Sequence, residues 1–128
     1  MPTTIKQRIG AEGEDIARRH LERAGLAFIA ANVRYRVGEL DLVMRDADGT
    51  VAFVEVRRRT HATYGGAAAS ITRFKCNRLI AAASCFLAAH RLATQPCRFD
   101  VVTIEGGGKD GNEDPHVAWL RDAFRPEN

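Results

Sequence analysis

The sequence predicts one mixed α/β domain in which helices flank a mixed β-sheet. A helical apolar pattern is followed by three strand-like segments, a second helical pattern and one or two more strands. This order combines hairpin and crossover connections, which a mixed sheet accommodates. Residues 51–56 form a nearly continuous apolar run, as in a strand covered on both faces. A length of 128 residues suits a single domain, so we treat residues 1–128 as one unit.

The first helix is expected over residues 4–24, where apolar side chains recur at helical spacing. They are Ile5, Ile9, Ile16, Ala17, Leu21 and Ala24. Gly25 follows the pattern, and a glycine at that position commonly ends a helix in the left-handed conformation. An amphipathic helix with one face toward the sheet is therefore predicted.

Three strands are expected next, over residues 26–33, 39–45 and 50–58. The turn between the last two decides their register. A two-residue turn at Asp48 and Gly49 would set Asp41 opposite Val56, whereas a three-residue loop with a left-handed Gly49 sets Asp41 opposite Glu55. We favour the three-residue loop, which brings the two carboxylates to roughly 5 Å at their Cβ atoms.

The second half of the chain predicts a loop, a helix and two strands. Residues 64–70 are rich in Gly and Ala and are typical of a loop, and Thr72 is a candidate N-cap for a helix that ends near His90. A fourth strand is expected over residues 97–105, a glycine-rich loop over 106–114, and a short last strand from about 116 to 121.

Composition excludes several classes of protein. A hydrophobic fraction of 45% with 27% charged residues is that of ordinary soluble domains, and a net charge of +3 alone identifies no partner. The N-terminus lacks the apolar centre of a signal peptide, and the longest apolar stretch, 79–89, is too short to cross a bilayer. We expect a cytoplasmic protein with no membrane partner, and the three cysteines, Cys76, Cys85 and Cys97, are expected to be inert buried thiols.

Asp41 and Glu55 stand out because each lies inside a strand-like apolar stretch. A buried carboxylate needs a cation, a metal or strong donors in place of water. Two oxygen ligands of this kind suit Mg²⁺ or Mn²⁺, to which the backbone carbonyl of Val56 could add a third, and Arg57 is the nearby cation for charge that develops on a phosphate. A plain salt-bridge network of Asp41, Glu55 and Arg57 inside the sheet is the alternative.

Cations follow the acidic cluster closely along the chain. Arg58, Arg59, Arg73 and Lys75 are the candidate nucleic-acid-binding residues. An acidic metal site surrounded by cations suits a phosphodiester substrate. A solvated surface with no partner is the alternative reading of the same residues.

Several short motifs occur in an order that resembles a known family. They are residues 10–17 (GAEGEDIA), Asn32, residues 38–41 (GELD), residues 53–57 (FVEVR), Lys75 and residues 98–102 (RFDVV). Together they resemble the bacterial YraN family, over about residues 7–124. The resemblance implies a restriction-endonuclease-like three-layer core, similar to Holliday-junction resolvases, with the order helix, three strands, helix, strand and a further strand.

The resemblance also implies a nuclease-type acidic signature. Glu14 matches the acid of the first helix, Asp41 the aspartate of the second strand, and Glu55 the glutamate of an ExK motif, so the implied catalytic set is Glu14, Asp41, Glu55 and Arg57. Arg57 departs from the pattern, which has lysine there; arginine keeps the charge but cannot supply a neutral amine. Lys75 could reach the site and supply one, or could be a surface lysine with an extended stem.

The leading expectation is a Mg²⁺- or Mn²⁺-dependent nuclease that acts on DNA, with branched or damaged structures as candidate substrates. A nucleic-acid-binding module of the same fold without turnover is the second reading, motivated by Arg57. A protein-interaction module is the third. A homodimer is plausible by analogy with resolvases and has no sequence feature of its own.

Overall fold

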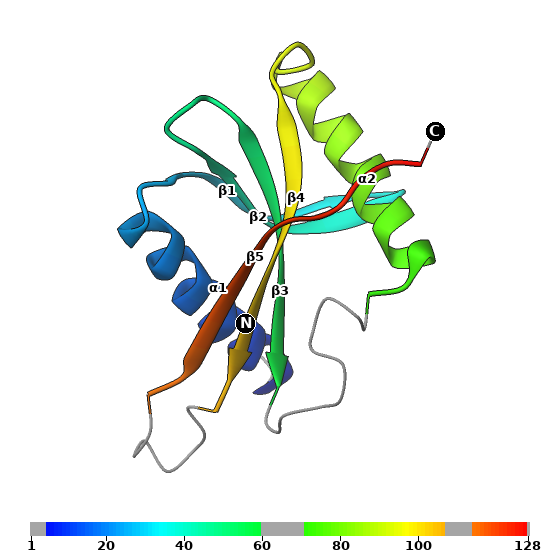
Figure 1. Cartoon of the computed structure of the whole chain (residues 1–128). Coiled ribbons are helices and arrows are strands. Elements are labelled where there is room, and N and C mark those ends of the chain that lie inside the picture. Colours follow the sequence, from blue (N-terminus) through cyan, green and yellow to red (C-terminus); the bar gives the residue numbers. More distant parts are fainter. Residues whose placement is uncertain (1–4, 60–70, 107–113, 128) are drawn as a thin grey trace.

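The computed structural model describes residues 5–59, 71–106 and 114–127, with the backbone alone for residues 5–10 and 59. In chain order the elements are α1 (Ile5–Arg23), β1 (Ala27–Tyr35), β2 (Gly38–Arg45), β3 (Val51–Arg59), α2 (Arg73–Ala89), β4 (Cys97–Glu105) and β5 (His116–Phe124). Figure 1 shows one sheet with α1 on one side and α2 on the other. The predicted three-layer α/β fold and its element order are confirmed. The expected loop at 64–70 and most of the one at 106–114 lie outside the described residues.

The sheet is mixed and has the strand order β1-β2-β3-β4-β5. Strands β3 and β4 are parallel, because α2 forms a crossover between them, and the other neighbours are antiparallel. All of β3 pairs with β4, from Val51 to Arg59, whereas only Val51 to Val54 pair with β2. Figure 1 shows the β1–β2 hairpin bending toward α2 while β3 continues beside β4. The strands thus separate after Val54, and we call this opening, between residues 38–41 of β2 and residues 55–59 of β3, the fork.

The core has two apolar clusters, one on each face of the sheet. Ala17 and Leu21 of α1 pack against one face, and Leu79 and Phe86 of α2 against the other. Leu42 belongs to the α1 cluster, but Leu40, only two residues earlier, belongs to the α2 cluster. Since residues two apart in a regular strand share a face, β2 twists at Asp41. This twist opens the fork.

The turn between β2 and β3 is the three-residue loop that the sequence favoured. The amide of Asp46 donates to the carbonyl of Thr50 at 2.9 Å, and Gly49 has a φ of 91°. The ladder that follows pairs Leu42 with Val54. One step further, this register brings Asp41 to the level of Glu55, as predicted.

The helix-end signals also hold. Gly25 has a φ of 102°, and the amide of Leu26 donates back to the carbonyl of Leu21 at 3.0 Å, which closes the end of α1. At the start of α2, the Thr72 hydroxyl accepts the amide of Lys75 at 3.1 Å. The cap fixes the position of the Lys75 backbone.

Two expectations were wrong in part. β5 does not stop near residue 121: it continues to Phe124, which pairs with Phe99 beyond an irregularity in the ladder where Asp122 has a φ of 53°. The three cysteines are free thiols, but only Cys76 is buried; Cys85 is half-buried, and Cys97 is exposed because it is the first residue of β4.

No helix in the described residues is long and apolar enough to cross a membrane.

Candidate metal centre

Glu55 is a nearly buried carboxylate on the face of the sheet that α2 covers. Its neighbours Val51 and Phe53, at strand spacing, belong to the α2 cluster, while Val54 belongs to the α1 cluster. The Glu55 side chain is only 6% exposed. It lies at the first position of β3 that has no partner in β2. A carboxylate this deep requires compensation from neighbouring groups.

Asp41 faces Glu55 across the fork. In a continued ladder Val56 would exchange backbone hydrogen bonds with Leu40, by the register of the earlier pairs. Instead the Val56 amide donates to Oδ2 of Asp41 at 2.9 Å. The N–H and C=O of one strand residue point toward the same edge, so the Val56 carbonyl also faces the fork. Two carboxylates and one carbonyl therefore surround the opening.

Asp41 is the carboxylate at the fork whose protonation is favoured by its surroundings. Burial and the nearby charge of Glu55 raise the pKa of Asp41 from its ordinary value of 3.8 to about 7. The Val56 amide acts in the opposite direction, Glu14 adds to the rise, and Lys75 opposes it. Like charges that are partly shielded from solvent favour the binding of a cation between them.

Glu14 extends the acidic group from α1. Asn32, at the level of Asp41 on the neighbouring strand, has a φ of 53° and donates its side-chain N–H to Oε2 of Glu14 at 2.7 Å. Burial is the main cause that raises the pKa of Glu14; the Asn32 bond lowers it, and the charge of Glu39 raises it again. The structure thus places Glu14 beside β1 of the sheet. The role of Asn32 as its donor was not foreseen, although asparagine is one of the few residues that readily adopt a positive φ.

Lys75 is the cation that contacts Glu55. Its Nζ lies 2.8 Å from Oε1 of Glu55, and its side chain is 42% exposed where that of Glu55 is 6%. The lysine therefore reaches inward from the first turn of α2. Of the two readings that the sequence left open, the structure has Lys75 at the acidic group.

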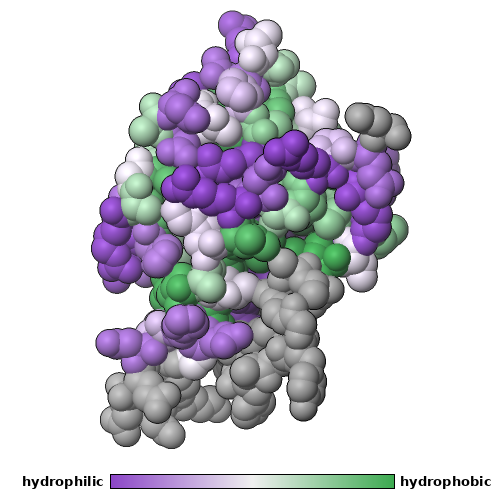
Figure 2. Space-filling view, viewed as in Figure 1, coloured by the Kyte–Doolittle hydropathy of each residue, from purple (hydrophilic) through white to green (hydrophobic). Residues whose placement is uncertain are grey.

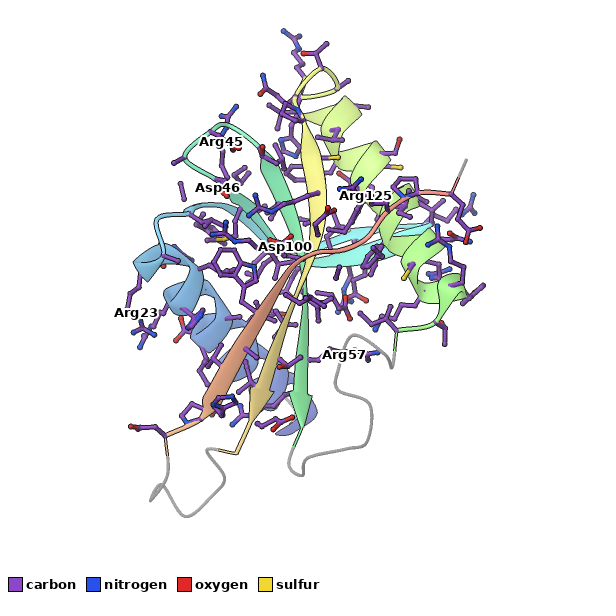
Figure 3. The ribbon with its side chains drawn as sticks, viewed as in Figure 1. Arg23, Arg45, Asp46, Arg57, Asp100 and Arg125 are labelled. Carbon is purple, nitrogen blue, oxygen red and sulfur yellow. The ribbon has the colours of Figure 1, made fainter. Side chains whose placement is uncertain are left out.

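The four arginines predicted to serve the site lie in different places. Arg57 follows Glu55 on the same face by alternation, and Figure 3 shows it projecting from β3 away from α1. Arg58 lies on the opposite face, where its Nη1 is 3.5 Å from Oε2 of Glu12. Arg73 donates to the carbonyl of Arg125 at 3.0 Å, so it holds the C-terminal tail. The side chain of Arg59 lies outside the described residues.

A second buried carboxylate, Asp100 of β4, is fully enclosed in hydrogen bonds. It accepts Nε of Arg98 at 3.1 Å on both oxygens, Nε1 of Trp119 at 3.1 Å and the amide of Asp122 at 2.9 Å. Arg98 continues to Asp46 at 2.7 Å. Figure 3 labels Asp100 near the centre of the molecule and Asp46 above it and to the left. Figure 2 shows a band of hydrophilic side chains across the same face. This network joins the β2–β3 turn to β4 and β5.

The donor set at the fork fits Mg²⁺ or Mn²⁺. No group of three or more His, Cys, Asp or Glu side chains among the described residues is arranged to hold a metal. A complete cage is not required, because Mg²⁺ commonly takes one or two carboxylates and fills its other positions with waters and substrate phosphate. Asp41, Glu55 and the Val56 carbonyl offer oxygen ligands of that kind, at an opening that already favours a cation.

Comparison with known proteins places the chain in a family. Residues 13–104 match the uncharacterised protein family UPF0102. The chain belongs to this family. It is 54% identical to a UPF0102 protein of Burkholderia pseudomallei over 123 residues, which cover 96% of the chain and 79% of the relative. It is also 54% identical to one of Burkholderia lata and 55% identical to one of Burkholderia vietnamiensis, each over 120 residues, 94% of the chain and 78% of the relative.

The family assignment confirms the resemblance to YraN proteins. The matched range includes Glu14, Asp41, Glu55 and Lys75, so every side chain that meets at the fork lies within the family region. The UPF0102 description carries no activity.

Proposed function

We propose that the protein is a metal-dependent nuclease that hydrolyses phosphodiester bonds in DNA, with branched or damaged structures as its preferred substrates. One observation carries the proposal: Asp41 and Glu55 meet across the fork, at the Val56 backbone, with an ammonium group already against Glu55. Placing a half-buried acid against a buried one lowers stability, so a ligand that uses both explains their presence better than folding does.

Each residue at the fork has a role in this proposal. Asp41, Glu55 and the Val56 carbonyl would hold Mg²⁺ or Mn²⁺, and the ion would supply an activated water and polarise the scissile phosphate. Glu14 adds negative charge that strengthens cation binding, and Asn32 keeps its carboxylate directed at the hairpin. The cations around the opening, Lys75 and Arg57, bind phosphate oxygens and offset the charge that grows on them.

The first turn of α2, which carries Lys75, also suits a nucleic acid. Phe74, next to Lys75 in the first turn of α2, is 73% exposed. An exposed ring beside cations offers a stacking platform for a base that is not stacked on its neighbours. Such bases occur at junctions, flaps and single strands, which favours substrates of this kind over regular duplex.

The test is cleavage of a panel of junction, flap, single-stranded and duplex DNA with Mg²⁺ or Mn²⁺. The wild-type protein should cut at least one structure, and Asp41→Asn and Glu55→Gln should each lower the rate by about 100-fold or more. Glu22→Gln is the matched control, because it removes a carboxylate of α1 that only pairs with Arg18 at the surface. Cleavage that persists in both fork variants would refute the proposal.

A non-catalytic DNA-binding module is the second candidate, and Arg57 is the observation that favours it. If turnover needs a neutral amine at this position, arginine cannot supply it. This candidate predicts salt-sensitive DNA binding, no cleavage by the wild-type protein, and a gain of cleavage in Arg57→Lys. Wild-type cleavage would exclude it.

A further inference from the structure

The contact between Lys75 and Glu55 occupies an oxygen that a metal ion would need. Nζ of Lys75 lies 2.8 Å from Oε1 of Glu55, which is a hydrogen-bonded ion pair. The pair spans two layers, since Lys75 belongs to α2 and Glu55 to β3. A divalent ion that binds Glu55 would have to displace the Lys75 ammonium from Oε1, and it would be repelled by the positive charge of that ammonium.

We propose that Lys75 is a built-in competitor of the metal: its ammonium neutralises Glu55 in the metal-free protein and moves to a substrate phosphate when DNA binds. Metal and DNA then bind cooperatively, and the ion is held firmly only when a substrate is present. The inference rests on the proposed nuclease function and deepens it, since it assigns a second task to a residue at the fork.

The two partners differ in their freedom to move. Glu55 is 6% exposed and lies in a strand whose whole length is paired with β4, so its carboxylate stays in place. The Lys75 side chain is 42% exposed and has a flexible stem of four carbons. Its backbone is held by the hydrogen bond to Thr72. The ammonium can therefore leave Glu55 without any change in the fold.

The charges around Glu55 explain why a competitor is useful. Asp41 lies opposite, and both Glu14 and Glu55 act on it electrostatically. Without a cation these carboxylates repel one another. Lys75 relieves that repulsion in the free protein, and a phosphate brought by DNA offers the ammonium a second anion once the metal takes its place on Glu55.

The decisive measurement is calorimetric titration of Mn²⁺ into the metal-free protein at pH 8, without DNA. Lys75→Met removes the competing charge and should bind Mn²⁺ roughly tenfold more tightly than the wild type. Lys75→Arg retains the charge and should stay near the wild type. Arg78→Met is the matched control, because it removes one exposed cation from the same helix and should leave Mn²⁺ affinity unchanged.

A second titration tests the transfer to phosphate. Mn²⁺ is titrated in the presence of a four-way junction made of phosphorothioate DNA, which resists hydrolysis. The junction should raise the Mn²⁺ affinity of the wild type about tenfold and that of Lys75→Met hardly at all, because coupling requires the lysine to move between the two anions. Equal coupling in both proteins would refute the transfer.

The outcomes separate this inference from the function it rests on. If all variants bind Mn²⁺ with the same affinity, Lys75 does not compete and the inference is wrong while the metal site stands. If no variant binds Mn²⁺, with or without the junction, the metal site and the inference both fail. Should Lys75→Met prove unstable, Lys75→Gln gives the same comparison with a side chain that can still hydrogen-bond Glu55.

Discussion

Two acids in the strands on either side of β3, the half-buried Asp41 and the fully buried Asp100, have opposite surroundings. Asp100 in β4 is fully buried and receives hydrogen bonds from Arg98, Trp119 and the amide of Asp122. Asp41 at the fork receives one from the Val56 amide and faces the like charge of Glu55. The first carboxylate is satisfied by the fold itself. The carboxylate of Asp41 instead lies close to other negative charges, and such surroundings are typical of residues that bind a ligand.

The contrast shows why burial alone does not identify a site. Both acids interrupt apolar strands, and in the sequence they look alike. The difference lies in the donors that the tertiary structure brings, and substitutions at the two positions should therefore change stability in opposite directions.

The largest expected effect is at Asp100. Asp100→Ala leaves the Arg98 guanidinium and the Trp119 N–H without their buried acceptor, so it should lower the free energy of unfolding by about 3–5 kcal/mol. Denaturant unfolding of the metal-free protein measures the change. A loss below about 1 kcal/mol would mean that water replaces the carboxylate and that the network contributes little to stability.

Asp41→Asn should have the opposite sign. Because the pKa of Asp41 is raised to about 7 in the folded protein, the folded state holds this proton more tightly than the unfolded state between pH 3.8 and 7, and stability falls as pH rises through that window. Asparagine removes the charge and keeps an acceptor for the Val56 amide. In a chelating buffer the variant should be more stable than the wild type by roughly 2 kcal/mol at pH 8 and by little at pH 4.

The pH series is its own control. A variant that is equally stabilised at both pH values would show that the benefit does not come from ionisation of Asp41. Added Mn²⁺ should stabilise the wild type and not the variant, in keeping with a ligand that binds the folded state.

The smallest effect on stability is expected at Asn32. Two variants separate the contribution of its side-chain hydrogen bond from that of its backbone conformation. Asn32→Gly accepts the positive φ and loses only the exposed bond to Glu14, so it should cost less than about 1 kcal/mol. Asn32→Ala loses the same bond and adds backbone strain, for roughly 1 kcal/mol more. Thermal unfolding compares the two, and equal stabilities would show that the hairpin relaxes at this position.

Local signals fixed much of the fold in advance. Gly25 and Thr72 mark helix ends through their own backbone and side-chain chemistry, and Gly49 sets the register because a left-handed residue is needed in the three-residue loop. That register predicted the meeting of Asp41 and Glu55. The exposure of Cys97 and the full length of β5 were missed, because both depend on where the sheet ends.

The sequence by itself determined the order of the elements, the two acids and the turn that aligns them, since these follow from short-range patterns and the chemistry of single residues. Only the tertiary structure decided the rest. The twist of β2 at Asp41 opens the fork, α2 brings Lys75 to Glu55, and β5 brings Trp119 to Asp100. Such contacts join residues far apart in the chain, and the packing of whole elements, which no local pattern encodes, selects them.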